Sequence, residues 1–233
     1  MPRMPLPGKR PARLPGAGPS MRAPLAGLKP VFGDRNDGRI RLVTLTPREV
    51  TPEIAEFLAD PDVMEGWNMP RREMGLDAFR AYVASFDNIK RSLMAIRMVE
   101  DNRPVGIIVL NIDHRHRSAA FHTCIGKKED RGQQIGVRAG TLLVRHAFED
   151  RKVEKLSFEM LERNAIAIGV VEKYGIQREG VLRKHRVDAL TGERLDEHVY
   201  GMMAEEYWPA IEALGKAGML PPFEGRGARP MKR

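Results

Sequence analysis

Apolar positions recur with a period of about 3.6 residues in two segments of the chain, residues 135–147 and residues 165–174. Polar residues occupy the positions between them, so each segment predicts an amphipathic helix with one buried stripe. The apolar run of residues 153–160 lies between the two helices and predicts a strand. Asn164 stands where a helix cap is expected, and Gly175 ends the second helix. This half of the chain therefore alternates helix, strand, helix and strand.

The remaining patterns predict an α/β fold, with a mixed, mostly antiparallel sheet and helices on both faces. Between the helical segments, the loop of residues 61–75 carries Trp67 among turn residues. The indole is expected either to form a wall of a substrate site or to fill the core. The other strands are expected at residues 40–45, 93–99, 105–112, 119–125 and 198–203, and the other helices at residues 52–58 and 76–86.

The composition indicates one domain, because 233 residues with 42% hydrophobic content are enough to bury a substantial core. No apolar run is long enough to cross a membrane, and the N-terminus lacks the apolar segment of a signal peptide. The single cysteine, Cys124, excludes an internal disulfide framework. We therefore expect a cytoplasmic protein.

The net charge of +8 is concentrated at the two ends of the chain. Residues 1–33 and 215–233 together carry eleven Lys or Arg and one Glu, so the rest of the chain is close to neutral. Eight of the 17 prolines lie in residues 1–33, and Met21 is an alternative start. We expect a disordered basic tail at residues 1–38, a folded domain at 39–207, and a helix end with a basic tail at 208–233. The tails are either functionally silent or attract RNA or the ribosome weakly.

Two glycines and a basic residue stand at the start of the first amphipathic helix. Gly132 and Gly136 remove side chains where a ligand could approach the backbone. The first helical N–H groups lack partners inside the helix, and Arg131 adds positive charge nearby. This junction predicts a pyrophosphate site, and the alternative is an ordinary turn before a core helix.

Three segments resemble the GNAT acetyltransferases, most closely the branch with ribosomal-protein N-terminal and amino-sugar acetyltransferases. The family's loop R/Q-x-x-G-x-G/A is similar to residues 131–136, with Gln134 in place of a glycine. Gln134 is expected either to keep a negative φ or to distort the loop, and a positive φ would cost about 1 kcal/mol. Residues 119–126 stand where the family's central strand precedes this loop. The family's second motif, N followed by E-K-x-G-F-x-x-E-G, is matched by Asn164, Glu172, Lys173, Gly175, Ile176, Glu179 and Gly180.

The resemblance covers residues 39–207 and implies an acetyl-CoA-dependent N-acetyltransferase without a metal. The sheet should split in a V beside residues 119–125, where pantetheine adds like a strand and an N–H near Thr123 or Cys124 polarises the acetyl carbonyl. A primary amine would then attack directly in a ternary complex. The residues implied to bind the cofactor are Thr123, Cys124, Ile125, Arg131, Gly132, Gln133, Gln134, Ile135, Gly136, Val137 and Asn164.

The family's usual catalytic carboxylate falls on Ala120 in this sequence. His122 lies on the same strand face and is the expected substitute, unless it is a buried histidine satisfied by the backbone. The family's tyrosine acid falls on Val171, so the thiolate would be protonated by water or by Tyr200. Glu65, Asp196 and Glu159 are the candidate carboxylates for holding a cationic amine, and Trp67 is the candidate wall of the substrate site.

The acceptor is expected to be an amino sugar or nucleotide sugar, or a protein N-terminus. Because Gln134, Ala120 and Val171 depart from the family pattern, a catalytically silent CoA-binding or ribosome-associated module is the alternative. His114 and His116 lack the further ligands of a metal site, and nothing near Cys124 indicates a reactive thiol.

Overall fold

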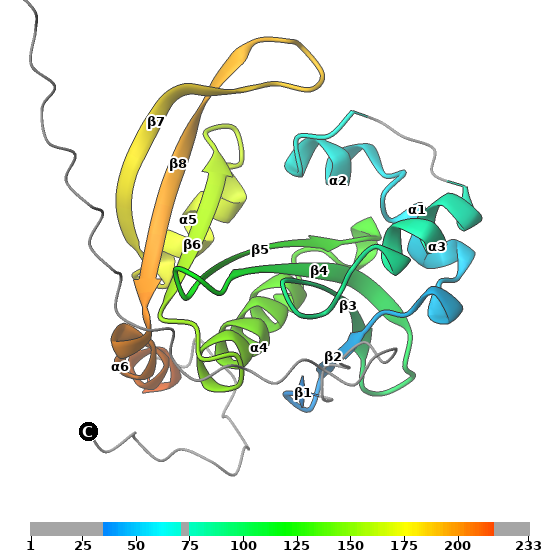
Figure 1. Cartoon of the computed structure of the whole chain (residues 1–233), viewed down its shortest axis with the longest axis horizontal. Coiled ribbons are helices and arrows are strands. Elements are labelled where there is room, and N and C mark those ends of the chain that lie inside the picture. Colours follow the sequence, from blue (N-terminus) through cyan, green and yellow to red (C-terminus); the bar gives the residue numbers. More distant parts are fainter. Residues whose placement is uncertain (1–34, 71–74, 217–233) are drawn as a thin grey trace, which may run out of the picture.

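A computed structural model describes residues 35–70 and 75–216, which form an eight-stranded sheet with helices on both faces (Figure 1). The strand order is β1-β2-β3-β4-β5-β6-β8-β7, and all neighbours are antiparallel except β5 and β6. The strands are β1 (Arg35–Asn36), β2 (Ile40–Thr44), β3 (Arg91–Met98), β4 (Pro104–Asp113), β5 (Ser118–Ile125), β6 (Lys155–Leu161), β7 (Gln177–Val187) and β8 (Arg194–Met203). The helices are α1 (Pro52–Glu56), α2 (Pro61–Gly66), α3 (Leu76–Ala84), α4 (Ile135–Glu149), α5 (Ala165–Lys173) and α6 (Ala204–Lys216).

Side chains that alternate along the central strands fill two separate cores. In β3, Leu93 and Ala95 pack with α1, α2 and α3, whereas Met94 and Ile96 pack with α4 and α6. The second of these cores also receives residues of α5. The expected fold class, a mixed and mostly antiparallel sheet covered on both faces, is confirmed.

Helix α2, which lies at the start of the segment expected to be a loop, was not predicted from the sequence. Asp60 caps it by accepting hydrogen bonds from the N–H groups of Asp62 and Val63, and Pro61 occupies the first helical position. Residues 71–74 of the same segment lie outside the described residues. A helix of six residues is too short to show a clear period, so only the cap and the proline could have indicated it.

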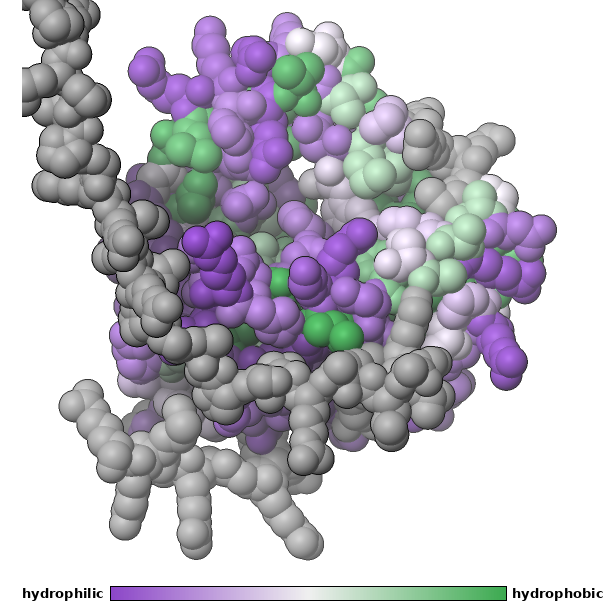
Figure 2. Space-filling view, viewed as in Figure 1, coloured by the Kyte–Doolittle hydropathy of each residue, from purple (hydrophilic) through white to green (hydrophobic). Residues whose placement is uncertain are grey.

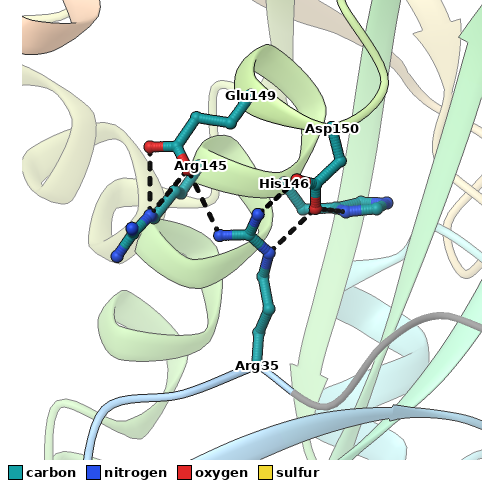
Figure 3. Close-up of polar contacts among 5 residues, drawn as sticks. All are labelled: Arg35, Arg145, His146, Glu149 and Asp150. Carbon is teal, nitrogen blue, oxygen red and sulfur yellow. Dashed lines mark hydrogen bonds and ion pairs between the residues drawn. The ribbon is translucent and has the colours of Figure 1, made fainter. Parts of the chain in front are cut away.

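Arg35 and Asn36, which lie in the segment expected to be an N-terminal tail, form the short strand β1 and pair with β2. Arg35 in β1 donates from Nε to Asp150 Oδ2 at 2.9 Å and lies 3.5 Å from Glu149 (Figure 3). His146 shares the same carboxylate, with Nδ1 2.6 Å from Asp150 Oδ2. These contacts fasten β1 to the end of α4. The rest of the expected tails, residues 1–34 and 217–233, lies outside the described residues.

The parallel strands β5 and β6 pair over three residues only and then diverge, which is the V-shaped split expected from the sequence (Figure 1). The last pair is Ala120 with Ser157. Immediately beyond it, the rings of Phe121 and Phe158 pack edge to face with centroids 5.4 Å apart, filling the wedge on one face. Residues 121–125 of β5 therefore present a backbone edge that no strand of the described sheet covers.

None of the helices within the described ranges has the length and apolar content that a membrane span requires.

Candidate active site

The loop before α4 closes although a glutamine replaces a glycine. Gly132 has φ +75°, and Gln134 adopts the left-handed conformation with φ 63° and ψ 7°. The expectation of a negative φ for Gln134 is wrong, but α4 still begins at the next residue. The Gln134 carbonyl accepts the first helical hydrogen bond, from Arg138 N–H at 3.0 Å. The side chain of Gln134 does not cap the helix, and the first turn holds no acidic residue, so the first N–H groups remain oriented toward the loop.

Arg131 turns inward from this loop and contacts β5 and α2. Its Nε and Nη2 donate to the carbonyls of Ile125 and Gly126 at 3.2 and 2.6 Å. Its guanidinium also lies 2.8 Å from Asp62 and 3.0 Å from Asp60. Burial opposes ionisation of Asp60, but the hydrogen bonds from Arg131 and from the N–H groups of Val63 and Asp62, together with the positive charge of Arg131, lower the pKa of this carboxyl. Arg131 therefore joins the loop, the end of β5 and the start of α2.

A second arginine that the sequence did not indicate holds the other side of the loop. Arg39 donates from Nη2 to Gln133 Oε1 at 2.9 Å and from Nη1 to the Gln133 carbonyl at 3.3 Å. Gln133 in turn donates to the carbonyl of Glu129. The contact between Arg39 and Gln133 joins residues 94 positions apart, and no local pattern predicts it.

The open edge of β5 presents the backbone of Thr123 and Ile125. The Gly126 N–H donates to Val105 of β4 at 2.9 Å. Because alternate residues of an antiparallel strand face the same neighbour, Cys124 also faces β4, whereas Thr123 and Ile125 face the open edge. Both edge carbonyls already accept a side-chain donor, since Trp67 Nε1 lies 3.2 Å from Thr123 O and Arg131 Nε bonds Ile125 O. The edge therefore offers mainly N–H donors to a ligand.

His122 and Cys124 lie on the same face of β5 but in different surroundings. Cys124 is buried, and burial raises the pKa of its thiol to about 12. The side chain of His122 is exposed, so the alternative of a buried histidine is wrong. Partial loss of water lowers the pKa of its imidazole, while the carboxylate of Glu159 acts in the opposite direction.

Three charged residues on neighbouring strands lie close enough to influence His122 electrostatically. Arg186 donates from Nε to Glu197 at 2.8 Å and from Nη2 to Glu159 at 3.3 Å. Glu197 is buried, whereas Glu159 is exposed. The group has a formal net charge of −1, from two carboxylates and one guanidinium, and lies on the sheet face toward α2. Sequence reasoning missed Arg186 and Glu197, because three different strands assemble this group.

The other expected site residues lie in several places. Tyr200 is fully buried, its hydroxyl donates to Glu172 at 2.7 Å, and burial raises its pKa. Asp196 accepts from the N–H of Lys184 at 2.7 Å, where β7 bulges out of register with β8. Asn164 caps α5 by accepting from Ala167 N–H at 3.2 Å, as expected.

Two further residues lie at the end of α2. The carboxylate of Glu65 is exposed, while its backbone carbonyl accepts from Arg163. Trp67 packs against the core of α1 to α3 and also reaches the open edge of β5, and its part in a substrate wall stays a prediction.

His114 and His116 lie on the turn between β4 and β5, where His114 Nε2 is 3.1 Å from the Ile89 carbonyl. In the part of the chain that the structure describes, no three His, Cys, Asp or Glu side chains form a group that could hold a metal ion.

Comparison with known proteins agrees with this geometry. A family model described as an acetyltransferase (GNAT) domain matches residues 39–177, more than half of the chain. The chain belongs to the GNAT acetyltransferase family. Its members transfer the acetyl group of acetyl-CoA to an amine, and the chain is accordingly an N-acetyltransferase. A search of curated proteins gave no match.

Solved structures show the same GNAT fold. A T. thermophilus protein assigned as an acetyltransferase is 28% identical, with 84% of this chain and 100% of that chain covered and a TM-score of 0.64. Mycobacterium smegmatis RimJ in complex with CoA-disulfide is 20% identical, with coverage of 81% and 94% and a TM-score of 0.66. Vibrio cholerae spermidine N-acetyltransferase in complex with CoA and spermine is 18% identical, with coverage of 73% and 98% and a TM-score of 0.65.

Proposed function

We propose that acetyl-CoA lies along the open edge of β5 with its pyrophosphate at the start of α4. The observation that carries this proposal is that Arg131 holds an uncapped helix N-terminus directly beside an uncovered strand edge. Pyrophosphate needs N–H donors and positive potential, and the N–H groups of Ile135, Gly136 and Val137 supply both. The first turn carries no acidic side chain that would repel it.

The remaining cofactor contacts follow from the same placement. Gly132 removes a side chain from the loop, while Gln133 and Gln134 set its shape. Thr123, Cys124 and Ile125 form the edge that pantetheine would join, and Asn164 holds the start of α5 on the other arm of the V. The bound thioester supplies an activated acetyl group. The orientation of β5 favours the N–H of Thr123, rather than that of Cys124, as the donor to the acetyl carbonyl.

The acceptor amine must lose a proton before it can attack the acetyl group directly. We assign this step to His122, whose lowered pKa keeps the imidazole unprotonated near neutral pH. Because Tyr200 is buried and its hydroxyl bonds Glu172, protonation of the leaving thiolate by water requires less rearrangement than protonation by Tyr200.

The charges around His122 suit a cationic amine. Glu159 and Glu197 outnumber Arg186 on this face, and the exposed Glu65 carboxylate and Trp67 belong to the opposite wall. Asp196 supports the bulge that presents Arg186. A protein N-terminus and an amino sugar both remain acceptor candidates, and the spermine bound to the V. cholerae enzyme adds a linear polyamine.

Weak attraction of the basic ends to RNA or the ribosome and a cytoplasmic location stay predictions.

Thermal unfolding with CoA and with acetyl-CoA tests the donor site. A ligand at 100 times its dissociation constant stabilises a protein by about 2.7 kcal/mol, so we expect a clear rise in Tm. Val137→Asp would place a carboxylate among the helix N–H groups and abolish this rise, while the matched Val137→Asn would retain most of it. The absence of any rise in the unmodified protein would contradict the proposal. A rise without turnover on a broad amine panel would favour a catalytically silent CoA-binding module.

A further inference from the structure

The end of α2 is hydrogen-bonded to the tip of the β7–β8 hairpin through one side chain. Asn68 donates from Nδ2 to the Val187 carbonyl at 2.9 Å, and its Oδ1 accepts from Ala189 N–H at 2.9 Å. The amide therefore pairs with the hairpin backbone as a neighbouring strand would. Asn68 has φ 52°, in the left-handed region that asparagine adopts more readily than most residues.

Arg163 anchors the same junction from the loop that follows β6. It donates to the Asn68 side-chain oxygen at 3.1 Å and to the Glu65 carbonyl at 2.8 Å. It also forms an ion pair with Asp188, a buried carboxylate at the hairpin tip. Breaking a buried pair is costly, so the junction is a fixed part of the fold rather than a loose surface contact.

Trp67, the neighbour of Asn68, completes a closed ring. Its indole reaches Thr123 on the open edge of β5, so α2 is bonded both to β5 and to the hairpin. Figure 1 views this ring face on, with β5 as its floor, β6 and β8 on one side, the hairpin above and α2 opposite. The space-filling view shows the surface hollowed between the hairpin and α2, with hydrophilic side chains over the hairpin (Figure 2). His122, Glu159 and Arg186 belong to strands of the ring.

We infer that this ring determines which acceptor amines can enter the site. It admits an amine at the end of an extended chain and excludes an amine attached directly to a sugar ring. The inference rests on the proposed function. The strands and α2 surround the opening, and the side chains of Trp67 and Asn68 close the two gaps between α2 and these strands. Groups next to the amine therefore have no lateral exit, whereas a chain can pass through. Asn68 is the positioning residue, because its amide joins α2 to the hairpin backbone through both of its polar atoms. The acceptor class is therefore a peptide N-terminus or a linear polyamine.

The test compares the unmodified full-length protein with Asn68→Gly. Glycine tolerates the positive φ, so this change removes the amide without adding backbone strain. Asn102→Gly is the matched control, because Asn102 also has a positive φ, 62°, but lies on the distant β3–β4 turn. Initial rates are measured with spermidine, with a peptide that has an N-terminal alanine, and with glucosamine. The rise in Tm with CoA and hydrogen exchange of the hairpin are measured on the same samples.

We expect the unmodified protein and Asn102→Gly to acetylate a chain amine much faster than glucosamine. Asn68→Gly should exchange hairpin amides faster, raise the rate ratio of glucosamine to chain amine about tenfold, and keep the CoA-induced rise in Tm. An unchanged ratio despite faster exchange, a preference of the unmodified protein for glucosamine, or no turnover of any probe while CoA still raises Tm would overturn the inference. Loss of the CoA effect in the unmodified protein would instead refute the proposed function and the inference with it.

Discussion

Gln134 shows how a single residue can depart from a family pattern while the local backbone is preserved. It takes the left-handed conformation that a glycine would take at little cost. We expect Gln134→Val to lower the free energy of unfolding by about 1–2 kcal/mol, since a β-branched side chain fits this conformation poorly. Gln134→Gly should not lower it. Urea unfolding of the three proteins measures the difference, and equal stability of the valine variant would show that the conformation of Gln134 is not strained.

His122 is the residue whose role depends most on proton transfer. Because its pKa is lowered from 6.5, the imidazole is neutral at pH 7 and accepts a proton only in more acidic solution. As a base it should therefore give a turnover rate that falls as the pH drops below neutrality. His122→Ala should lower turnover about 100-fold and remove this acidic limb. His116→Ala, on the exposed β4–β5 turn, is the control, and an unchanged profile in His122→Ala would exclude His122 from the mechanism.

Sequence reasoning succeeded at the residue scale where the chemistry is local. The Asn164 cap and the Gly175 helix end, with φ +68°, both follow from neighbouring residues. It could not identify partners that lie across the fold. The position of Arg131 beside a phosphate stays a prediction, and its partners Asp60 and Asp62 lie far away in the chain, so only tertiary structure could show them.

At the scale of elements, one glycine sets how closely β5 approaches α1. A Cβ on Gly126 would lie 2.0 Å from the ring of Phe57, a buried core residue that cannot move freely. Gly126→Ala should therefore destabilise the protein by about 1–3 kcal/mol. Gly169→Ala is the counterpart, because no atom lies within 4 Å of its added methyl, and alanine favours the helix by about 0.5–1 kcal/mol. Urea unfolding should show opposite signs, and destabilisation by both would contradict this account.

The helices and strands differ in how well the sequence alone predicts them. The long helix α4 was predicted because its apolar stripe extends along its whole length, whereas the six residues of α2 give no reliable period. The hydrophobic pattern of neither β5 nor β6 indicates that the two strands diverge. Phe121 and Phe158, which pack against each other where the strands diverge, come from strands separated by the whole of α4. For that reason the resemblance to a family, rather than periodicity, indicated the V.

At the scale of the whole molecule, charge separates the folded domain from the ends. Residues 35–216 have equal numbers of acidic and basic residues, so the net charge of +8 comes entirely from residues 1–34 and 217–233. Within the domain, basic side chains form ion pairs that join distant segments, such as Arg138 with Asp37 at 2.8 Å and Arg103 with Asp130 at 2.7 Å. The sequence revealed the excess of charge at the ends, but the pairing required the fold.

The burial of His146 in α4 makes the stability of the whole domain sensitive to pH. Burial lowers the pKa of His146 to about 4, and the carboxylate of Asp150 only partly opposes this shift. His146 has a pKa near 6.5 in the unfolded chain. Between pH 6.5 and 4 it therefore binds a proton in the unfolded chain but not in the folded state. The stabilising contribution is complete above pH 6.5 and is lost as the pH falls toward 4, at a rate of at most about 1.4 kcal/mol per pH unit.

His146→Gln should remove this dependence, because glutamine can still hydrogen-bond Asp150 but takes up no proton. The slope of unfolding free energy against pH reports how many more protons the unfolded chain binds than the folded state. Between about pH 4.5 and 6.5 we expect this number to fall by close to one, as measured by urea unfolding at several pH values. His116→Gln, an exposed change, should leave the slope as it is. If His146→Gln kept the full slope, the acid sensitivity would arise from the carboxylates. Asp150 is the first to examine then, because burial opposes its ionisation, yet Arg35 and His146 hold its pKa low.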